Sequence, residues 1–314
     1  MKFFVREGVF VLILLLATGL GFGQNTAEQI WTKGIEYGAQ GKFKEAKEEF
    51  EKALKVDPSF KTVERFLKLI EDVNQQKKKS KTAISYFKGV ACQLKRRWDE
   101  AIDEYNKAIE INPEYACAYN ARGHAYYIKG QYDKAISDFT KAIKLNPRNA
   151  EAYNDRGITY DEGKSEYDKA ISDFTKAIEL NPKDAKPYNN RGNAYVKKGK
   201  FDKAISDYTK AIEINPRNAT AYYYNRGNAY DEEGQYDKAI SDYNKAIELN
   251  PGDAKTYFRR GIVYFEKSLY DHAISDYNKA IEINPREAKA YFNRGGAYKK
   301  KGQYDQAISD YNKP

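Results

Sequence analysis

A proline that returns every 34 or 35 residues is the feature that most constrains the fold of this chain. Near-identical segments end at these prolines, among them "YDKAISDFTKAIKLNP" at 132–147 and "YDKAISDYNKAIELNP" at 236–251. Self-similarity at a fixed period of this length is typical of a solenoid, in which each unit buries its apolar face against its neighbours. The sequence therefore predicts a stack of small units instead of one globular core. The regular prolines are Pro113, Pro147, Pro182, Pro216, Pro251 and Pro285, with Pro58 as an earlier member of the series.

Each unit is predicted to contain two helices. In the unit 185–218, apolar residues such as Tyr208 recur at helical spacing in the second half. Pro216 ends this half, because proline cannot continue a helix, and Gly199 separates it from the first half. Gly192 lies inside the first helix, where Gly costs about 0.5–1 kcal/mol relative to Ala. We therefore expect the second helix to approach the first closely at that glycine.

Aligned by their prolines, the units share three columns of residue types. The first column is glycine in the first helix: Gly34, Gly89, Gly123, Gly157, Gly192, Gly227, Gly261 and Gly295. The second is alanine in the second helix: Ala46, Ala101, Ala135, Ala170, Ala204, Ala239, Ala273 and Ala307. The third is an aromatic residue four positions later: Phe50, Tyr105, Phe139, Phe174, Tyr208, Tyr243, Tyr277 and Tyr311. Column by column, residues 27–60 and 82–314 resemble the tetratricopeptide repeat (TPR) family.

This resemblance implies an all-α fold, an α-solenoid or superhelix of helix-turn-helix TPR units. We divide the chain into a signal peptide (1–23), a first TPR unit (24–60), an extra amphipathic helix with a basic linker (61–81) and a TPR array (82–314). The array holds six complete units and a seventh that stops at "DYNKP", before its second helix is complete. That end is interpreted as a truncated product, or alternatively as an exposed end that docks onto another molecule. The 35-residue units 150–184 and 219–253 each carry one extra residue, in the inter-helix turn of the former and at or before the first helix of the latter. The second insertion is expected to disturb the stacking locally.

The first residues differ from the rest of the chain. Lys2 and Arg6 precede an apolar run from Val9 to Ala17, and small residues follow up to Gly23. This order is typical of a secretory signal peptide, and the run is shorter than the ~20 residues that span a bilayer. We therefore expect cleavage after residue 23 and a secreted or periplasmic protein. An uncleaved membrane anchor is the alternative, and membrane contact is expected only in that case.

Two charged columns predict a set of ion pairs inside the units. Every first helix has a cation just before its glycine: Lys33, Lys88, Arg122, Arg156, Arg191, Arg226, Arg260 and Arg294. Every second helix has an acid just before its aromatic residue: Glu49, Glu104, Asp138, Asp173, Asp207, Asp242, Asp276 and Asp310. These positions fall at similar heights in an antiparallel helix pair, so we interpret them as a structural ion-pair ladder. The alternative is a row of arginines that binds acidic ligands.

Asparagine is the residue type that points most directly to a ligand. The resemblance places first helices on the inner, concave wall, and an asparagine amide offers both donors and an acceptor to an extended peptide backbone. The candidate side chains are Asn120, Asn154, Asn189, Asn190, Asn193, Asn225, Asn228 and Asn293. The alternative is that they are polar surface or local caps.

The resemblance also implies a possible site for a C-terminal carboxylate. Some members of the family hold this group with a Lys, Asn, Asn, Lys, Arg pattern from three consecutive repeats. The pattern fits Asn189, Asn193, Asn225, Lys255 and Arg259, with asparagine in place of the first lysine. Lys255 and Arg259 lie one helical turn apart, on one face.

We therefore predict a non-catalytic scaffold that binds extended segments or C-termini of other proteins. The alternative function is a structural component of a cell-envelope complex that uses its exposed ends, in which case self-association is expected. Two His and two Cys, in unrelated columns, offer no metal-ligand spacing, so no catalytic residue, metal or cofactor is predicted. Nucleic acid is not an expected partner, because a short run such as "QKKKSK" is ordinarily a solvated loop.

Overall fold

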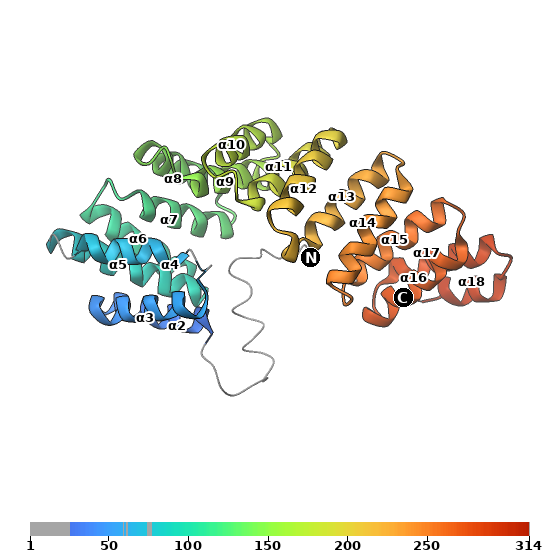
Figure 1. Cartoon of the computed structure of the whole chain (residues 1–314), viewed down its shortest axis with the longest axis horizontal. Coiled ribbons are helices and arrows are strands. Elements are labelled where there is room, and N and C mark those ends of the chain that lie inside the picture. The colour runs from blue at the N-terminus through green and yellow to red at the C-terminus, as the bar shows by residue number, and fades with distance from the viewer. Residues whose placement is uncertain (1–25, 59, 61, 74–76, 314) are drawn as a thin grey trace. The chain divides into compact units, whose positions relative to one another are not determined.

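The computed structural model describes residues 26–58, 60, 62–73 and 77–313 (Figure 1). The predicted signal peptide (1–23) and part of the predicted basic linker lie outside the described residues. The described part is all-helical, with 17 α-helices and no strand. None of these helices is both long enough and apolar enough to span a membrane. The all-α prediction is therefore confirmed for the described chain.

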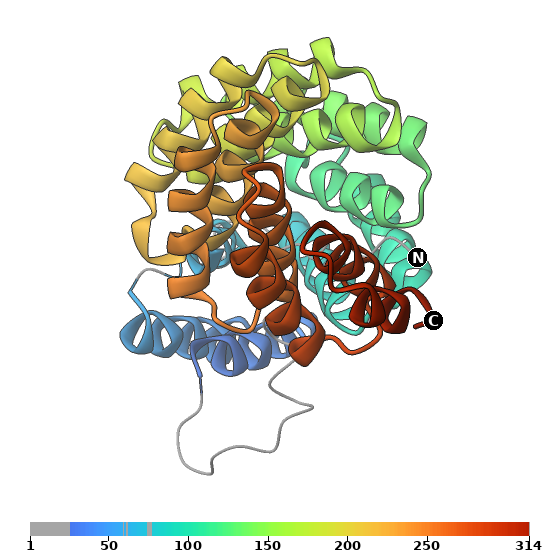
Figure 2. The ribbon, with the colours of Figure 1, turned by 90° about the vertical axis from the view of Figure 1, so that its right-hand side faces the viewer.

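The chain divides into two compact units, with the boundary in the sequence between Thr159 and Tyr160. The helices of unit 1 are α2 (Ala27–Ala39), α3 (Phe43–Val56), α4 (Thr62–Val73), α5 (Lys77–Leu94), α6 (Trp98–Ile111), α7 (Ala116–Ile128), α8 (Tyr132–Leu145) and α9 (Ala150–Ile158). A π-helical turn η1 (Thr159–Gly163) follows α9. The helices of unit 2 are α10 (Tyr167–Leu180), α11 (Ala185–Lys197), α12 (Phe201–Ile214), the 3₁₀ turn η2 (Pro216–Asn218), α13 (Thr220–Glu232), α14 (Tyr236–Leu249), α15 (Ala254–Glu266), α16 (Tyr270–Ile283), α17 (Ala288–Lys300) and α18 (Tyr304–Tyr311). Figure 2 shows the same helices from the side of α15 to α18.

Consecutive first and second helices pack as antiparallel hairpins. In unit 2 these hairpins are α11/α12, α13/α14, α15/α16 and α17/α18. The turn inside a hairpin requires a left-handed residue, which glycine adopts without steric cost. Gly199 fills this position with a φ of 66°, whereas Ser268 takes the same position with a φ of 59°.

The glycine column permits the close helix approach that the sequence predicts. A Cβ placed on Gly192 would lie 2.7 Å from Cε1 of Tyr208, and one on Gly227 would lie 2.8 Å from the same atom of Tyr243. Both tyrosine rings are buried, as is the alanine column beside them. The core of each hairpin is therefore one aromatic ring of the second helix lying on a bare stretch of first-helix backbone.

First helices of unit 2 also contact one another from hairpin to hairpin. Helix α11 contacts α13, α13 contacts α15, and α15 contacts α17, whereas each second helix packs chiefly on the first helices beside it. The first helices therefore lie on the tighter side of this stack. Their outward positions form one continuous surface, which we call the first-helix face of unit 2.

Helix α4 interrupts the regular hairpins of unit 1. Its residue Phe66 is fully buried, with ring centroids 6.0 Å from Trp31, 5.6 Å from Phe50 and 5.5 Å from Phe87. These three rings belong to α2, α3 and α5, so α4 fills the space between the first hairpin and α5. Helix α5 begins at Lys77 and thus extends into the segment for which the sequence predicted a linker.

The two extra residues are absorbed without loss of the repeat. In the unit 150–184, we predicted the insertion in the inter-helix turn, and the structure shows the π-helical turn η1 at the end of the first helix. In the unit 219–253, the 3₁₀ turn η2 precedes α13. The turn is the local irregularity caused by the insertion, and beyond it Asn225 of α13 donates a 2.9 Å hydrogen bond to Asn189 of α11 and Arg226 donates to Thr209 of α12 at 2.8 Å. A helical turn that winds more loosely or more tightly takes up one residue while the packed columns stay in register.

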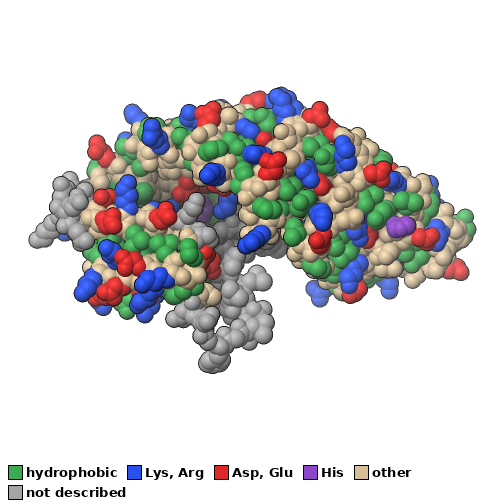
Figure 3. Space-filling view, viewed as in Figure 1, with side chains coloured by type: hydrophobic (Ala, Val, Ile, Leu, Met, Phe, Trp, Pro, Cys, Tyr) green, Lys and Arg blue, Asp and Glu red, His purple; other side chains and the backbone are tan. Residues whose placement is uncertain are grey.

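A set of surface ion pairs links successive hairpins. The lysine directly after a first helix pairs with an exposed aspartate of the preceding second helix. The pairs are Lys129–Asp99, Lys198–Asp168, Lys267–Asp237 and Lys301–Asp271. In the α13/α14 hairpin this position is Glu233, which accepts a 2.6 Å hydrogen bond from Gln235. The interspersed cationic and anionic side chains are visible on the surface in Figure 3.

Candidate functional site

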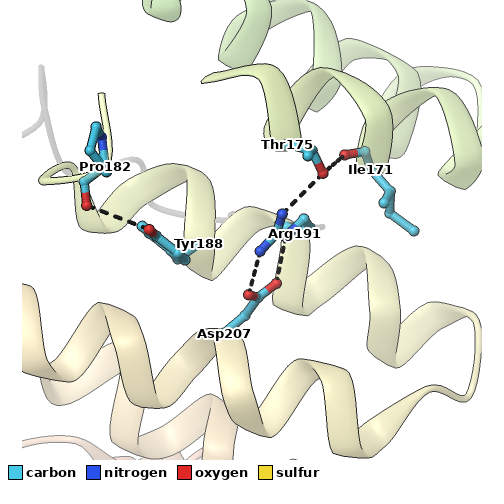
Figure 4. A network of polar contacts seen from close by, with 6 residues as sticks. All are labelled: Ile171, Thr175, Pro182, Tyr188, Arg191 and Asp207. Carbon is cyan, nitrogen blue, oxygen red and sulfur yellow. Dashed lines mark hydrogen bonds and ion pairs between the residues drawn. The ribbon is translucent and has the colours of Figure 1, made fainter. Parts of the chain in front are cut away.

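The predicted ion-pair ladder forms, and it occupies its arginines fully. In the α11/α12 hairpin, Arg191 donates from Nε and Nη2 to the two carboxylate oxygens of Asp207, at 2.8 and 2.7 Å (Figure 4). The Arg191 side chain is 17% exposed and that of Asp207 is 7% exposed. The hydrogen bond to Asp207 raises the pKa of Arg191 even though burial opposes the charge. Equivalent pairs are Arg122–Asp138, Arg226–Asp242, Arg260–Asp276 and Arg294–Asp310.

Each of these arginines also reaches the preceding second helix, a contact that sequence reasoning missed. Nη1 of Arg191 donates to Oγ1 of Thr175 at 3.0 Å, and Nη1 of Arg226 donates to Oγ1 of Thr209 at 2.8 Å. Thr175 in turn donates to the carbonyl of Ile171 at 2.7 Å. The signal was present, because the residue after the aromatic column is always Asn or Thr where the next unit has an Arg. The acceptors in this column are Asn106, Thr140, Thr175, Thr209, Asn244 and Asn278.

The ladder therefore stabilises the stack and does not form a row of free cations. The two units with lysine behave differently. Lys33 makes a single contact of 3.3 Å to Glu49, which also accepts from Lys52 at 2.9 Å. Glu104 pairs with Lys107 of its own helix at 2.6 Å. A planar guanidinium holds a carboxylate with two hydrogen bonds, and a lysine ammonium does not.

Four of the predicted asparagines lie on α11 and α13, two adjacent first helices of unit 2. Asn189 and Asn225 are hydrogen-bonded to each other at 2.9 Å. The Oδ1 atom of Asn193 accepts from the hydroxyl of Tyr208 at 2.7 Å, and Oδ1 of Asn228 accepts from the hydroxyl of Tyr243 at 2.8 Å. The set Asn189, Asn193, Asn225 and Asn228 is called the Asn cluster below. Because the tyrosine rings are buried, these bonds fix the orientation of Asn193 and Asn228.

The other predicted asparagines have different surroundings. Asn120 of α7 is buried, and Oδ1 of this residue has no partner in the described part of the chain. Asn154 of α9 is half-buried with its amide 3.5 Å from Oδ1 of Asp155, and both residues belong to unit 1. Asn190 is half-buried beside the Asn cluster, whereas Asn293 donates to the carbonyl of Lys289 in its own helix at 2.8 Å. Asn120 and Asn154 are thus not part of the Asn cluster.

Lys255 and Arg259 both lie exposed on α15, in the hairpin that follows the Asn cluster. Neither side chain forms an ion pair within the described residues of unit 2. The predicted carboxylate-binding set thus comes from three successive first helices, α11, α13 and α15. It offers two unpaired cations next to amide donors.

A buried acid near the start of unit 2 was not predicted. Asp161 lies in η1 and is 7% exposed. Its Oδ2 atom accepts from Lys197 at 2.6 Å, while Oδ1 has no partner among the described residues. Burial raises the pKa of Asp161, and Lys197 opposes this shift. The extra residue of this unit produces the π-helical turn, and only that turn places the carboxylate in the interior.

The described residues hold no group of three His, Cys, Asp or Glu side chains able to bind a metal ion. The buried Cys92 and the exposed Cys117 are free thiols.

The described chain is a stack of helical hairpins with a polar surface on its first helices, where hydrogen bonds already hold some of the side chains. This is the architecture of a repeat protein that holds other macromolecules.

Comparison with known families identifies the repeat. The family described as "Tetratricopeptide repeat" matches residues 30–60, 185–218 and 221–253. The family described as "TPR repeat" matches residues 95–129, 123–162, 164–199 and 263–302. The chain belongs to the tetratricopeptide repeat family. Comparison of the sequence with curated proteins gives no match.

Solved structures of TPR proteins are similar to this chain. A chain of the APC/C hetero-tetramer Cut9-Hcn1 has 21% identity and a TM-score of 0.61, over 86% of this chain and 55% of that one. YrrB, described as a TPR protein with an unusual peptide-binding site, has 27% identity and a TM-score of 0.51, over 59% of this chain and 95% of that one. The MamA protein has 32% identity and a TM-score of 0.51, over 56% of this chain and 96% of that one. The chain thus spans about half the length of the Cut9-Hcn1 chain. The repeat family supports a protein-interaction scaffold, and the similar solved structures support the fold.

Proposed function

We propose that this protein is a scaffold that binds an extended segment of another protein on the first-helix face of unit 2, at the Asn cluster. The observation that carries the proposal is the pair of tyrosine–asparagine bonds. Tyr208 and Tyr243 occupy the oxygens of Asn193 and Asn228, so the amide N–H groups of both side chains are left to donate. Asn189 likewise accepts through Oδ1 and keeps its donors, while Asn225 keeps an acceptor.

This arrangement matches the hydrogen-bonding groups of a peptide backbone. Every residue of an extended segment offers one carbonyl acceptor and, except for proline, one N–H donor. A row of amides in two successive hairpins pairs with such groups whatever the side chains are. Because the buried tyrosines already hold two of the amides, little side-chain entropy is lost on binding. The similarity to a TPR protein described as having a peptide-binding site supports the same assignment.

The test is peptide binding by isothermal titration, with segments selected from a peptide array. The double variant Asn189→Ala/Asn225→Ala removes both partners of one hydrogen bond, so it leaves no buried group unpaired. We expect it to weaken binding roughly tenfold, since each lost hydrogen bond contributes about 0.5–1.5 kcal/mol. The matched control Ser206→Ala/Ser241→Ala changes two exposed positions of second helices and should bind as the wild type does. Equal affinities of the two double variants would refute the assignment of the face.

We also propose that the bound segment ends in a free carboxylate held by Lys255 and Arg259. Both cations are exposed and unpaired within the described part of unit 2, and a carboxylate there would accept charge-assisted hydrogen bonds. The same titration compares peptides with free and amidated C-termini. Equal affinity for both peptides, or unchanged binding in Lys255→Ala and Arg259→Ala, would refute the carboxylate site. The proposal that the Asn cluster binds the peptide backbone would be unaffected.

We place the protein in a secreted or periplasmic compartment, on the basis of the order of charged, apolar and small residues at 1–23. Mass spectrometry of the mature protein should find Gln24 or a close neighbour first. An intact Met1 on membrane-bound protein would contradict cleavage.

A second candidate function is a structural component of a cell-envelope complex. The side chains that we assign to such an interface are Phe292 of α17, which is 67% exposed, and Ile308 of α18, which is 58% exposed. Light scattering over a concentration series distinguishes the two functions. Self-association without peptide, abolished by Phe292→Ser, supports assembly, and a monomer at all concentrations supports the peptide scaffold.

A further inference from the structure

Asp161 and Asp207 are two carboxylates of unit 2 that are equally buried but differently hydrogen-bonded. Their side chains are 8% and 7% exposed. Both oxygens of Asp207 accept from Arg191, at 2.8 and 2.7 Å. Asp161 accepts from Lys197 through Oδ2 at 2.6 Å, and its buried Oδ1 atom has no partner among the described residues. Because burial disfavours a charge that is not fully hydrogen-bonded, the ionised form of Asp161 is supported less than that of Asp207.

The contact between Asp161 and Lys197 is not imposed by the repeat. Asp161 stands four residues after the glycine of its first helix, and Lys197 stands five residues after the glycine of the next one. Further along unit 2 the same two positions are Val196 and Glu232, Asp231 and Glu266, and Phe265 and Lys300. None of these combinations offers an acid to a lysine. The contact is therefore specific to the π-helical turn η1, and such turns occur frequently at functional sites.

The surroundings of Asp161 make it the titrating member of the contact. Burial raises the pKa of Asp161, Lys197 opposes the shift, and the charge of Glu162, its exposed neighbour in η1, adds to it. Nζ of Lys197 lies 5.6 Å from the ring centroid of Tyr167 of α10. Burial raises the pKa of Tyr208 of α12, and the charges of nearby aspartates, Asp161 among them, raise it further. Phenols and ammonium groups do not titrate at acidic pH, so a proton taken up in the interior here goes to Asp161.

We propose that the Asp161–Lys197 pair is a pH-sensitive contact that holds the Lys197 ammonium at neutral pH and releases it to the first-helix face when Asp161 is protonated. Lys197 is an exposed residue that follows Asn193 by one helical turn, on the same side of α11. Its release therefore adds an unpaired cation beside the Asn cluster. This regulation rests on the proposed peptide-binding function: a segment with an acidic side chain at that place binds more tightly as the pH falls.

The first test is the pH dependence of stability, measured on the full chain by urea unfolding. An acid whose pKa is raised in the folded state contributes stability that is lost as the pH rises through the raised pKa and regained as the pH falls. Wild type should therefore gain stability relative to Asp161→Asn when the pH is lowered from about 7.5 to about 4.5, above the usual range of an aspartate in an unfolded chain. The readout is the shift of the urea midpoint between the two proteins.

Asp168→Asn is the matched control for this test. Asp168 of α10 pairs with Lys198, the residue next to Lys197, but it is exposed, and its hydrogen bond from Lys198 lowers its pKa. A lowered pKa leaves this group largely ionised over the whole range, so its difference from wild type should stay constant. Lys197→Met removes the cation that opposes the shift of Asp161, so the gain in stability should begin at a higher pH. Lys198→Met should leave it unchanged.

The second test measures the release of Lys197 by fluorescence anisotropy. The probes are labelled dodecapeptides of alanine and serine, capped at both ends, with one central glutamate or glutamine. In wild type the preference for glutamate should be about threefold greater at about pH 5 than at about pH 7.5, as an exposed ion pair would give. Asp161→Asn should show the acidic-pH preference at both pH values. Lys197→Met should show the neutral-pH preference at both.

Each outcome decides between the two proposals. A constant difference in stability between wild type and Asp161→Asn would overturn the pH-sensitive contact, and the shift in Lys197→Met decides this if circular dichroism shows that Asp161→Asn does not fold. Stability that depends on Asp161 without any change in the preference for glutamate would overturn the release of Lys197 and leave the peptide-binding function standing. Failure of both peptides to bind at either pH would refute the peptide-binding function and the regulation that rests on it.

Discussion

Breaking one rung of the Arg–Asp ladder gives the most direct test of how this stack is held together. The perturbation is a double-mutant cycle on Arg191 and Asp207, made with Arg191→Ala, Asp207→Ala and the double variant. Both side chains are mostly buried, at 17% and 7% exposed, and they share two hydrogen bonds of 2.7 and 2.8 Å. Either single change leaves a partly buried charge without its partner.

The expected magnitudes follow from that geometry. Removing one partner of a buried pair costs about 3–5 kcal/mol, and the partial exposure of Arg191 places this rung at the lower end. The double variant should cost less than the sum of the singles, with a coupling of about 0.5–3 kcal/mol. Thr175→Val removes the hydroxyl that links Arg191 to the preceding hairpin, together with its own bond to the carbonyl of Ile171, and should cost about 1–2 kcal/mol.

The assay must respect the architecture, because a stack of repeats opens in segments and does not always unfold as one unit. Urea unfolding followed by circular dichroism gives the total effect, and hydrogen exchange of amides in α10 to α12 gives the local one. The matched control is Lys210 and Glu213, an exposed pair at 2.8 Å on α12, for which a coupling close to zero is expected because water screens both charges. Strict additivity at Arg191 and Asp207, or a coupling no larger than that of the control, would refute the structural role of the ladder.

Three further predictions concern single side chains of unit 2, each measured by urea unfolding. Gly227→Ala should destabilise by about 1–3 kcal/mol through overpacking, since its Cβ would lie 2.8 Å from a ring atom, whereas Gly296→Ala should gain about 0.5–1 kcal/mol because its nearest neighbours are 3.9 Å away. The same sign for both glycines would contradict this reading of the packing. Tyr243→Phe should cost about 0.5–1.5 kcal/mol, because its hydroxyl donates to an asparagine, and Tyr277→Phe should be neutral or stabilising because its hydroxyl is unpaired. A larger loss for Tyr277→Phe would show that its hydroxyl has a partner in solution. Glu233→Lys should restore the lysine–aspartate pair seen at the neighbouring hairpins and gain up to about 1 kcal/mol at low salt, and a gain that persists in 1 M salt would argue against an ionic origin.

The hairpins and the ladder were predictable because their signals lie in columns that repeat along the sequence. Gly192 predicted a close approach, and the ring of Tyr208 occupies it. Arg191 and Asp207 were predicted as a pair because they stand at the same height of every hairpin, and the pair is present with two hydrogen bonds. A residue type that recurs at the same position of every unit supports a structural prediction more strongly than a single occurrence does.

The conformation of a unit that carries one inserted residue could not be predicted, because the repeat period does not show which turn accommodates the insertion. The sequence showed an extra residue near Asp161 but gave no reason to expect a π-helical turn that buries this carboxylate. It also showed Tyr208 and Asn193 in separate columns, 15 residues apart. Only the hairpin geometry shows that the tyrosine hydroxyl ends at the asparagine, and therefore which amide groups remain to donate.

Differences among the repeats of this chain separate structure from function on the first-helix face. The position just before each glycine of unit 2 is always arginine, and its bonds are the same from hairpin to hairpin. The position just after each glycine varies, and its residues are Asn193, Asn228, Ile262 and Gly296. Packing imposes the first position equally on every hairpin, because each arginine must meet one aspartate and one preceding helix. At the second position an asparagine accepts from the buried tyrosine of the same hairpin, but Ile262 shows that the fold tolerates the loss of this bond, so this position is less constrained than the arginine. The change from asparagine to isoleucine occurs in α15, where the buried hydroxyl of Tyr277 has no acceptor among the described residues. Lys255 and Arg259 are exposed on the same helix, so we expect the most selective contacts of the partner segment at that hairpin and the least selective ones at the Asn cluster.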